Sequence, residues 1–313
     1  MSRTVIAFLL LAALFVAGAL VWMLTRPGAE PALDQAARLD SPYWTGDDRL
    51  VDVDGVMARV RSEGPADAPV IVMVHGFSYS LESWDAWAED LGADYRVIRL
   101  DLPGHGLTGP DPQQRYSVPQ TVDFLGSLLD ELGLDHVTLA GNSLGGLVSW
   151  RLAAERPDLV SRLVLVAPGA YSINGVTEEP VAVPMAVSFY LTSAPEAMVA
   201  AASAGLFGDV SRMDPALPGR VHALMNTPGV GQALVERLEV FTLPDPTADL
   251  ARVQAPTLVM WGGRDVMIPV AQASRIAGDL PQAELIIYED LGHILHEEDP
   301  ARTIADVRAF LAE

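Results

Sequence analysis

The strongest constraint on the fold of this chain is a set of six short, nearly continuous apolar runs. Each run is separated from the next by a segment with helical spacing. Runs this apolar are typical of strands that are buried on both faces. The segments between them place apolar residues on one helical face, which is typical of crossover helices. The chain therefore predicts an α/β fold with a mostly parallel, doubly wound sheet. The runs are PVIVMVHG, YRVIRLDLPG, HVTLAGNS, SRLVLVAPG, APTLVMWGG and AELIIYEDLGH.

Two segments depart from this alternation. Residues 49–64 have apolar residues at every second position on both sides of an Asp-Gly pair, which predicts an antiparallel hairpin. Residues 172–250 are rich in Ala, Met and Leu and predict a helical cap inserted above the sheet edge; a solvated helical subdomain is the alternative. The predicted organisation is an N-terminal anchor or signal segment (1–25), a linker (26–48), the first part of the core (49–171), the cap (172–250) and the second part of the core (251–313).

The N-terminal segment carries a separate signal. Residues 5–24, VIAFLLLAALFVAGALVWML, contain no charge, and a helix of this length matches a hydrocarbon core of about 30 Å. The apolar run continues past the small residues Ala17 to Ala19 and places Trp22 near an interface, which favours a membrane anchor formed by a single N-terminal helix. The alternative is a signal peptide cleaved after Ala19, which would make the protein secreted or periplasmic.

Composition excludes several classes of function. The 41 Asp and Glu residues against 20 basic residues give a formal net charge of −21, which would repel nucleic acid. All the basic residues are arginine, so lysine Schiff-base chemistry is excluded. Cysteine is absent, the histidines are scattered, and no glycine-rich phosphate loop is followed by lysine. The sequence therefore implies neither a metal nor an organic cofactor.

Ser143 is the candidate nucleophile. It lies between Gly141 and Gly145 in GNSLG, after a predicted strand and before a predicted helix. In such an elbow the serine backbone takes a strained turn that presents the hydroxyl above the sheet, and a side chain at either glycine would crowd its neighbours. This context favours a nucleophile over an ordinary turn residue.

A serine nucleophile needs a histidine base, and His293 is the candidate. It follows the last apolar run, at the end of the sheet where the elbow also points. His296, three residues later, lies in the acidic stretch HEEDP and is expected at the surface. His136 and His222 are expected to be structural, and His105, in a glycine-rich turn, is expected to shape a loop.

Asp265 is the candidate for the acid that orients the histidine. It follows the strand run LVMWGG, and it gives the chain order Ser, Asp, His. A helix N-cap is the alternative role for this aspartate. Asp290 lies only three residues before His293 and would need an awkward local turn to reach it.

The oxyanion formed in acyl transfer needs hydrogen-bond donors. Leu144 follows the nucleophile, and Phe77 follows a His-Gly pair at the end of a strand, so their backbone N–H groups are the predicted oxyanion hole. Met185 and Phe189, in an almost uncharged stretch of the cap, are predicted to line an apolar acyl pocket over Ser143. The alternative is that such cap residues pack against the core domain.

The motifs HGFSYSLESW, RLDLPGHGLT, GNSLGG, WGGRD and LGHILHEEDP resemble those of the α/β-hydrolase superfamily in order and spacing, from about residue 50 to the C-terminus. The resemblance implies the same triad of Ser143, Asp265 and His293, with Phe77 and Leu144 as oxyanion donors. It also implies a structural role for the turn at Asp101 and Gly104.

Within this family the elbow residue separates the activities. Haloalkane dehalogenases and most epoxide hydrolases carry aspartate at the elbow, so Ser143 argues against both. The carbon-carbon bond hydrolases share the serine triad but typically have a more glycine-rich stretch after the His-Gly pair. The resemblance thus implies a carboxylesterase-like or lipase-like enzyme that cleaves a small-molecule ester with an apolar acyl group through an acyl-enzyme. An acyltransferase, a carbon-carbon bond hydrolase and a non-catalytic ligand-binding protein of the same fold are the alternatives.

Overall fold

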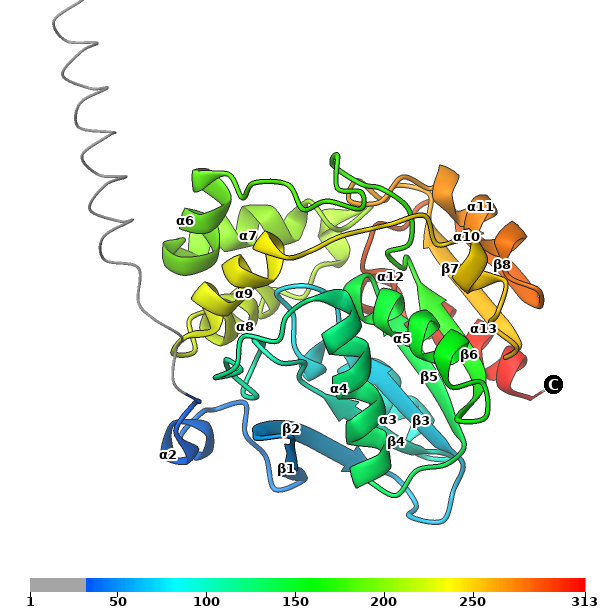
Figure 1. Ribbon diagram of the computed structural model, residues 1–313, viewed down its shortest axis with the longest axis horizontal. Coiled ribbons are helices and arrows are strands. Elements are labelled where there is room, and N and C mark those ends of the chain that lie inside the picture. The colour runs from blue at the N-terminus through cyan, green and yellow to red at the C-terminus, as the bar shows by residue number, and fades with distance from the viewer. Residues whose placement is uncertain (1–31, 313) are drawn as a thin grey trace, which may run out of the picture. The chain divides into compact units, whose positions relative to one another are not determined.

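A mixed sheet of eight strands lies at the centre of the part of the chain that the structure describes. The computed structural model describes residues 32–312, and their strand order is β1-β2-β4-β3-β5-β6-β7-β8 (Figure 1). β2 pairs antiparallel with β1 and β4, and all other neighbours are parallel, which confirms the predicted α/β sheet. The strands are β1 (Asp48–Val53), β2 (Val56–Glu63), β3 (Val70–Val74), β4 (Arg96–Leu100), β5 (Val137–Asn142), β6 (Val160–Val166), β7 (Thr257–Gly262) and β8 (Ala283–Tyr288).

The predicted hairpin is formed by β1 and β2. Val53 pairs with Val56, so the connection has two residues, Asp54 and Gly55. Their φ angles are 51° and 86°, the left-handed values that a tight hairpin turn with the twist of its strands requires. The Asp-Gly pair therefore fixes the register of this hairpin.

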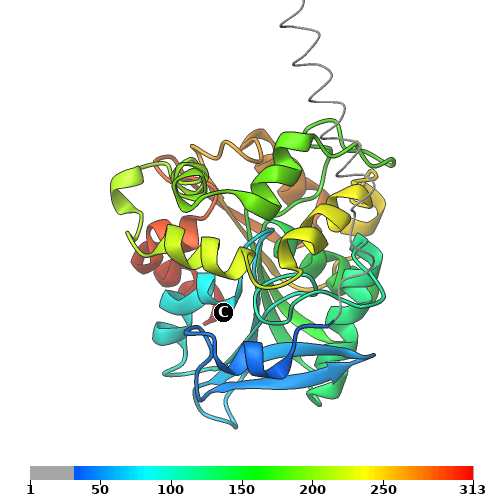
Figure 2. The ribbon, with the colours of Figure 1, turned by 90° about the vertical axis from the view of Figure 1, so that its left-hand side faces the viewer.

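Helices cover both faces of the sheet. In Figures 1 and 2, α4 and α5 pack together on one side of the sheet, and α3 and α13 pack together on the other. The central strands are consequently buried on both faces, which explains their unbroken apolar sequences. The helices of the core that flank the sheet or follow its strands are η1 (Leu81–Trp84), α3 (Asp85–Leu91), α4 (Val118–Glu131), α5 (Leu144–Glu155), α11 (Ala271–Asp279), α12 (Leu295–Glu298) and α13 (Pro300–Leu311).

The segment between β6 and β7 is helical and packs over the loops at the carboxyl ends of the strands (Figure 1). α6 packs on α9 and α7 on α8. Their buried side chains form one apolar cluster with Tyr79 from the loop after β3 and Ile294 from the loop after β8. We call these helices the cap: α6 (Met185–Ser193), α7 (Glu196–Ala204), η2 (Val210–Arg212), α8 (Leu217–Met225) and α9 (Val230–Glu239). The short helix α10 (Thr247–Leu250), which follows the cap, packs instead on α5 and α11 of the core.

Part of the segment expected to be a linker forms a short helix, α2 (Gln35–Leu39). Asp34 caps its N-terminus, and the buried Arg38 donates hydrogen bonds to the carbonyls of Leu107 and Thr108. These bonds dock α2 on the core. The sequence did not reveal them because the acceptors are backbone groups about 70 residues away.

The predicted membrane anchor, residues 5–24, lies outside the described residues and stays a prediction. Within residues 32–312, no helix has both the length and the apolar character needed to cross a bilayer.

Candidate active site

Ser143 lies at a strained turn between β5 and α5. Its φ and ψ angles are 53° and −112°, a region that non-glycine residues rarely occupy. The flanking glycines allow this turn: a Cβ at Gly141 would lie 2.5 Å from the carbonyl oxygen of Gly145, and a Cβ at Gly145 would collide with the carbonyl of Val74. The local geometry is therefore that of the nucleophile elbow expected from the sequence.

The side chains of His293 and Asp265 meet at the carboxyl end of the sheet. His293 Nδ1 lies 2.8 Å from Asp265 Oδ2, and both side chains are buried. The other carboxylate oxygen, Oδ1, accepts the backbone N–H groups of Met267 and Ile268 at 2.8 and 2.9 Å. One carboxylate thus caps the loop after β7 and orients the imidazole at the same time.

Asp290, the alternative acid, points elsewhere. Its carboxylate is exposed and pairs with Arg212 at 2.9 Å and Arg302 at 2.8 Å. These two guanidinium groups hold the pKa of Asp290 at about 2. Its partners are therefore surface arginines rather than His293.

The backbone of His293 is held between the elbow and the cap. The Asn142 side chain, next to Ser143, donates to the His293 carbonyl at 3.3 Å. The His293 N–H donates to the carbonyl of Leu206, after α7, at 2.7 Å. The structure thus brings the elbow, His293 and Asp265 to one edge of the sheet, although they are far apart in sequence. Sequence reasoning missed Asn142, whose signal was a polar residue at the end of an apolar strand.

The two predicted oxyanion donors flank the elbow. Phe77 follows Gly76, where an added Cβ would lie 3.4 Å from the Cβ of Ser143 and 2.8 Å from Asn142 Oδ1. Leu144 is the first residue of α5, where backbone N–H groups have no partner inside the helix. Within residues 32–312, neither N–H donates to another protein group. Their role as oxyanion donors stays a prediction.

His75 sets the orientation of the Gly76–Phe77 peptide. The Leu102 N–H donates to His75 Nε2 at 3.0 Å, so the neutral ring carries its proton on Nδ1. Nδ1–H donates to the Gly76 carbonyl at 2.7 Å. Burial lowers the pKa of His75 and keeps the ring neutral. Because the carbonyl and N–H of a trans peptide point in opposite directions, this bond turns the Phe77 N–H away from the ring.

The turn after β4 is structural, as expected. Asp101 is fully buried, pairs with Arg59 at 3.2 Å, and accepts the backbone N–H groups of Leu81 and Leu107 at 2.8 Å each. Gly104 has a φ of 78°, a value that glycine adopts without strain. This carboxylate therefore ties the turn to the loop that follows β3.

His296 corrects one expectation: it is buried, not at the surface. It is 1% exposed, its ring centroid lies 4.3 Å from that of Trp84, and neither ring nitrogen has a hydrogen-bond partner within the described residues. Burial lowers its pKa to about 3. The acidic neighbours in sequence suggested a position at the surface, but the ring of Trp84, in η1, covers His296.

The other histidines lie away from His293 and Asp265. His105 is buried, with Nδ1 3.1 Å from the Pro103 carbonyl, in the turn that it was expected to shape. His136 is exposed before β5, and His222 is half-buried in α8. No group of three or more His, Asp or Glu side chains within residues 32–312 is arranged to hold a metal ion.

The cap residues predicted to line an acyl pocket lie on α6. Met185 and Phe189 are 53% and 50% exposed. Other apolar residues of the same stretch, such as Leu191, Val199 and Phe207, are buried in the cap cluster. The acyl-pocket role of Met185 and Phe189 stays a prediction.

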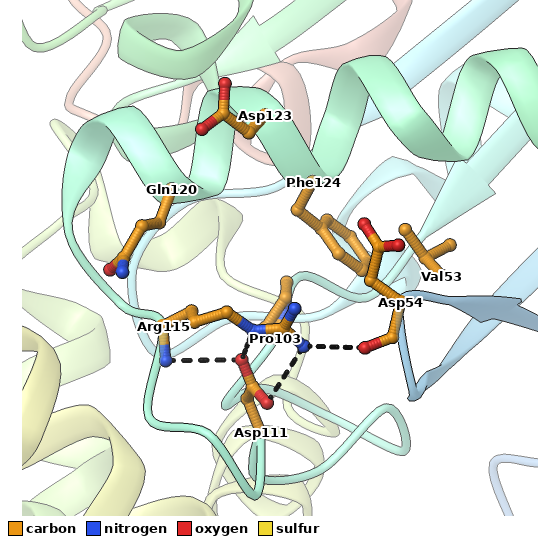
Figure 3. Close-up of a pocket in the computed structure, with 8 residues that line it drawn as sticks. All are labelled: Val53, Asp54, Pro103, Asp111, Arg115, Gln120, Asp123 and Phe124. Carbon is orange, nitrogen blue, oxygen red and sulfur yellow. Dashed lines mark hydrogen bonds and ion pairs between the residues drawn. The ribbon is translucent and has the colours of Figure 1, made fainter.

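Two hollows lie away from His293 and Asp265. One, of about 190 Å³, lies between the β1–β2 hairpin and the start of α4, where Arg115 pairs with Asp111 and donates to the Asp54 carbonyl (Figure 3). The other, of about 430 Å³, is lined by residues on both sides of the junction between core and cap, including Tyr171 and Arg275. Neither hollow is lined by Ser143, Asp265 or His293.

Comparisons with known proteins agree with the fold. A family model described as "alpha/beta hydrolase fold" matches residues 69–300. An uncharacterized protein of Mycobacterium tuberculosis is 31% identical over 284 residues, covering 81% of this chain and 77% of that protein. The "Putative carbamate hydrolase RutD" of Pseudomonas savastanoi pv. phaseolicola is 32% identical over 257 residues, covering 77% of this chain and 94% of that protein.

A solved structure shows the same likeness. A hydrolase from Pseudomonas aeruginosa PA01 superposes with a TM-score of 0.72 and 26% sequence identity, covering 86% of this chain and all of the other. With its sheet order, its serine elbow and the family match over residues 69–300, the chain belongs to the α/β-hydrolase superfamily and is a hydrolase of that fold.

Proposed function

We propose that this protein is a serine hydrolase that cleaves a carboxylic ester through an acyl-enzyme. The observation that carries the proposal is the 2.8 Å contact between His293 Nδ1 and a buried carboxylate oxygen of Asp265. With Nδ1–H donating to Asp265, the neutral imidazole has its lone pair on Nε2, which is the atom that a nucleophilic serine needs as its base.

The proposed reaction has two halves. His293 Nε2 takes the proton of Ser143 Oγ as the oxygen attacks the ester carbonyl, and the imidazolium then gives that proton to the departing alcohol. A water molecule activated by the same histidine hydrolyses the acyl-enzyme and releases the acid. In each half, the negative oxygen of the tetrahedral intermediate accepts hydrogen bonds from the N–H groups of Phe77 and Leu144.

The proposed substrate is a small-molecule ester with an apolar acyl group. Met185 and Phe189 offer apolar surface on α6 and are the proposed contacts for the acyl chain. The proposed location is a membrane surface, with the chain anchored by residues 5–24.

The test is turnover of p-nitrophenyl butyrate by the full chain, with covalent labelling by a fluorophosphonate. Wild type should release nitrophenol and take up one label, and Ser143→Ala should do neither. A folded wild type without turnover or label would refute the proposal and favour a ligand-binding role. Release of nitrophenol with transfer of the acyl group to an added alcohol, and little free acid, would instead identify an acyltransferase.

A further inference from the structure

Glu298, which has no part in the proposed reaction, binds three backbone N–H groups. Oε2 accepts from Gly292 at 2.7 Å and from Gly208 at 2.9 Å, and Oε1 accepts from Asp209 at 2.8 Å. The residue is 4% exposed, and within residues 32–312 no arginine forms an ion pair with it. Backbone donors therefore provide the direct stabilisation of this buried charge, through charge-assisted hydrogen bonds.

The three donors come from two different parts of the molecule. Gly292 immediately precedes His293, whereas Gly208 and Asp209 lie in the cap segment between α7 and η2. The two segments also contact each other directly, because the His293 N–H donates to the carbonyl of Leu206 at 2.7 Å. The Glu298 carboxylate thus joins the same two segments through a second set of hydrogen bonds.

Both glycines at this junction are needed for the close approach. A Cβ at Gly292 would collide with the carbonyl of Leu206, and a Cβ at Gly208 would collide with the carbonyl of Asp290. The Gly208 carbonyl in turn accepts from Arg264 at 3.0 Å, next to Asp265. The cap segment therefore contacts the loop of His293 through backbone groups and the loop of Asp265 through the Arg264 side chain.

We propose that Glu298 is a positioning residue that fixes the backbone of His293 to the cap, so that the position of the cap sets the position of the catalytic base. The inference rests on the proposed function of His293. Because reacting groups displaced by about 1 Å can lose roughly 100-fold in rate, a carboxylate that holds this junction controls kcat without touching the substrate.

The neighbouring Glu297 provides a matched control. It belongs to the same helix, α12, and also reaches the cap, but it pairs with Arg220 of α8 at 2.5 Å. It forms no hydrogen bond to Gly292, His293 or the cap segment 206–209. Glu297→Gln therefore weakens the attachment of the cap at a different point, with the same change of side chain.

The kinetic test compares Glu298→Gln with Glu297→Gln in the full chain. A glutamine at 298 has one acceptor oxygen and sets an NH2 donor against a backbone donor, so the junction loosens. We expect kcat for p-nitrophenyl butyrate to fall by about 10- to 100-fold, with KM changed less than about threefold. The midpoint of the pH profile of kcat, which reports on His293, should also shift.

Glu297→Gln should keep kcat within about twofold even where it lowers the melting temperature. Equal losses of kcat in the two variants would overturn the proposal.

A second measurement does not depend on turnover. Amide hydrogen exchange at residues 206–209 and 292–293 should accelerate together in Glu298→Gln and stay unchanged in Glu297→Gln. If wild type showed no ester turnover but exchange still accelerated at both segments in Glu298→Gln, the proposed function would be refuted and the coupling would stand. Unchanged exchange in Glu298→Gln would overturn the coupling itself. If the glutamine variant does not fold, Glu298→Asp, which keeps the charge on a shorter side chain, should show the same pattern to a smaller degree.

Discussion

The two carboxylate oxygens of Asp265 bind different partners: Oδ2 lies 2.8 Å from His293 Nδ1, while Oδ1 accepts hydrogen bonds from the backbone N–H groups of Met267 and Ile268. In Asp265→Asn the amide oxygen should keep the two backbone donors, which leaves the NH2 facing Nδ1. An NH2 donor there forces the histidine proton onto Nε2, the wrong tautomer for a base. We expect kcat to fall by about 10⁴-fold. Asp290→Asn, at an exposed carboxylate, should leave the rate unchanged, and a similar loss in both variants would place the acid elsewhere.

Ser143 and His293 should act as one unit. If His293 takes the proton of Ser143, removing either side chain disables the same step, so the double variant Ser143→Ala/His293→Ala should be only slightly slower than either single variant. The measurement is kcat/KM for p-nitrophenyl butyrate in all four proteins. Multiplicative losses would show that the two residues act independently.

His75 should affect the transition state more than substrate binding. His75→Phe removes the Nδ1–H that holds the Gly76 carbonyl and leaves the Leu102 N–H without its acceptor. The Gly76 carbonyl then keeps only the longer hydrogen bond from the Tyr79 N–H, at 3.3 Å, so the Phe77 N–H is held less firmly. We expect kcat to drop by up to about 100- to 1000-fold, the usual cost of losing one oxyanion donor. KM should change little, and binding of a boronic acid analogue should weaken in parallel with kcat. The control is His105→Phe, because the ring of His105 packs against that of His75. A change in KM alone would contradict this role.

His296 should make the protein sensitive to acid. Its pKa is about 3 in the fold against 6.5 in a free side chain, so between these values the unfolded state binds a proton that the folded state does not. The free energy of unfolding should therefore fall with decreasing pH below about 6.5, by up to about 1.4 kcal/mol per pH unit from this group. His296→Phe removes no hydrogen bond, because neither ring nitrogen has a partner among residues 32–312. Its melting temperature should exceed that of wild type increasingly from pH 6.5 to pH 4. Parallel curves would mean that His296 does not titrate in this range.

The acyl specificity should depend on α6. If Met185 and Phe189 contact the acyl chain, kcat/KM for p-nitrophenyl esters should rise by up to about 0.8 kcal/mol, or roughly fourfold, per added methylene and then decline once the contact surface is filled. Replacing both side chains by glutamine should flatten this profile. A flat wild-type profile, or one that the replacements leave unchanged, would remove these residues from the substrate site.

The N-terminal segment should hold the native protein in the membrane. Activity should stay with membranes washed in alkaline carbonate, and the mass of the purified chain should include residues 5–24. A native chain that begins at Leu20 would instead identify a cleaved signal peptide.

The sequence by itself determined the sheet, the elbow and the order of the candidate site residues. Strand runs such as VIVMV need burial on both faces, the Asp54-Gly55 pair supplies two left-handed residues in a row, and Gly141 and Gly145 give room for the turn at Ser143. Each of these signals is local, because the spacing of apolar residues and the freedom of a glycine are properties of a few neighbouring positions.

Only the tertiary structure decided what surrounds those residues. His296 has acidic neighbours in sequence, yet the ring of Trp84, more than 200 residues earlier, covers it. Glu298 receives hydrogen bonds from the cap and from the loop before His293, and Asn142 reaches the carbonyl of His293. In the contacts of Glu298 and Asn142, a side chain meets backbone groups of a separate segment. Every residue has such groups, so no pattern of side chains marks which of them will meet, and only the packing of the cap on the sheet selects them.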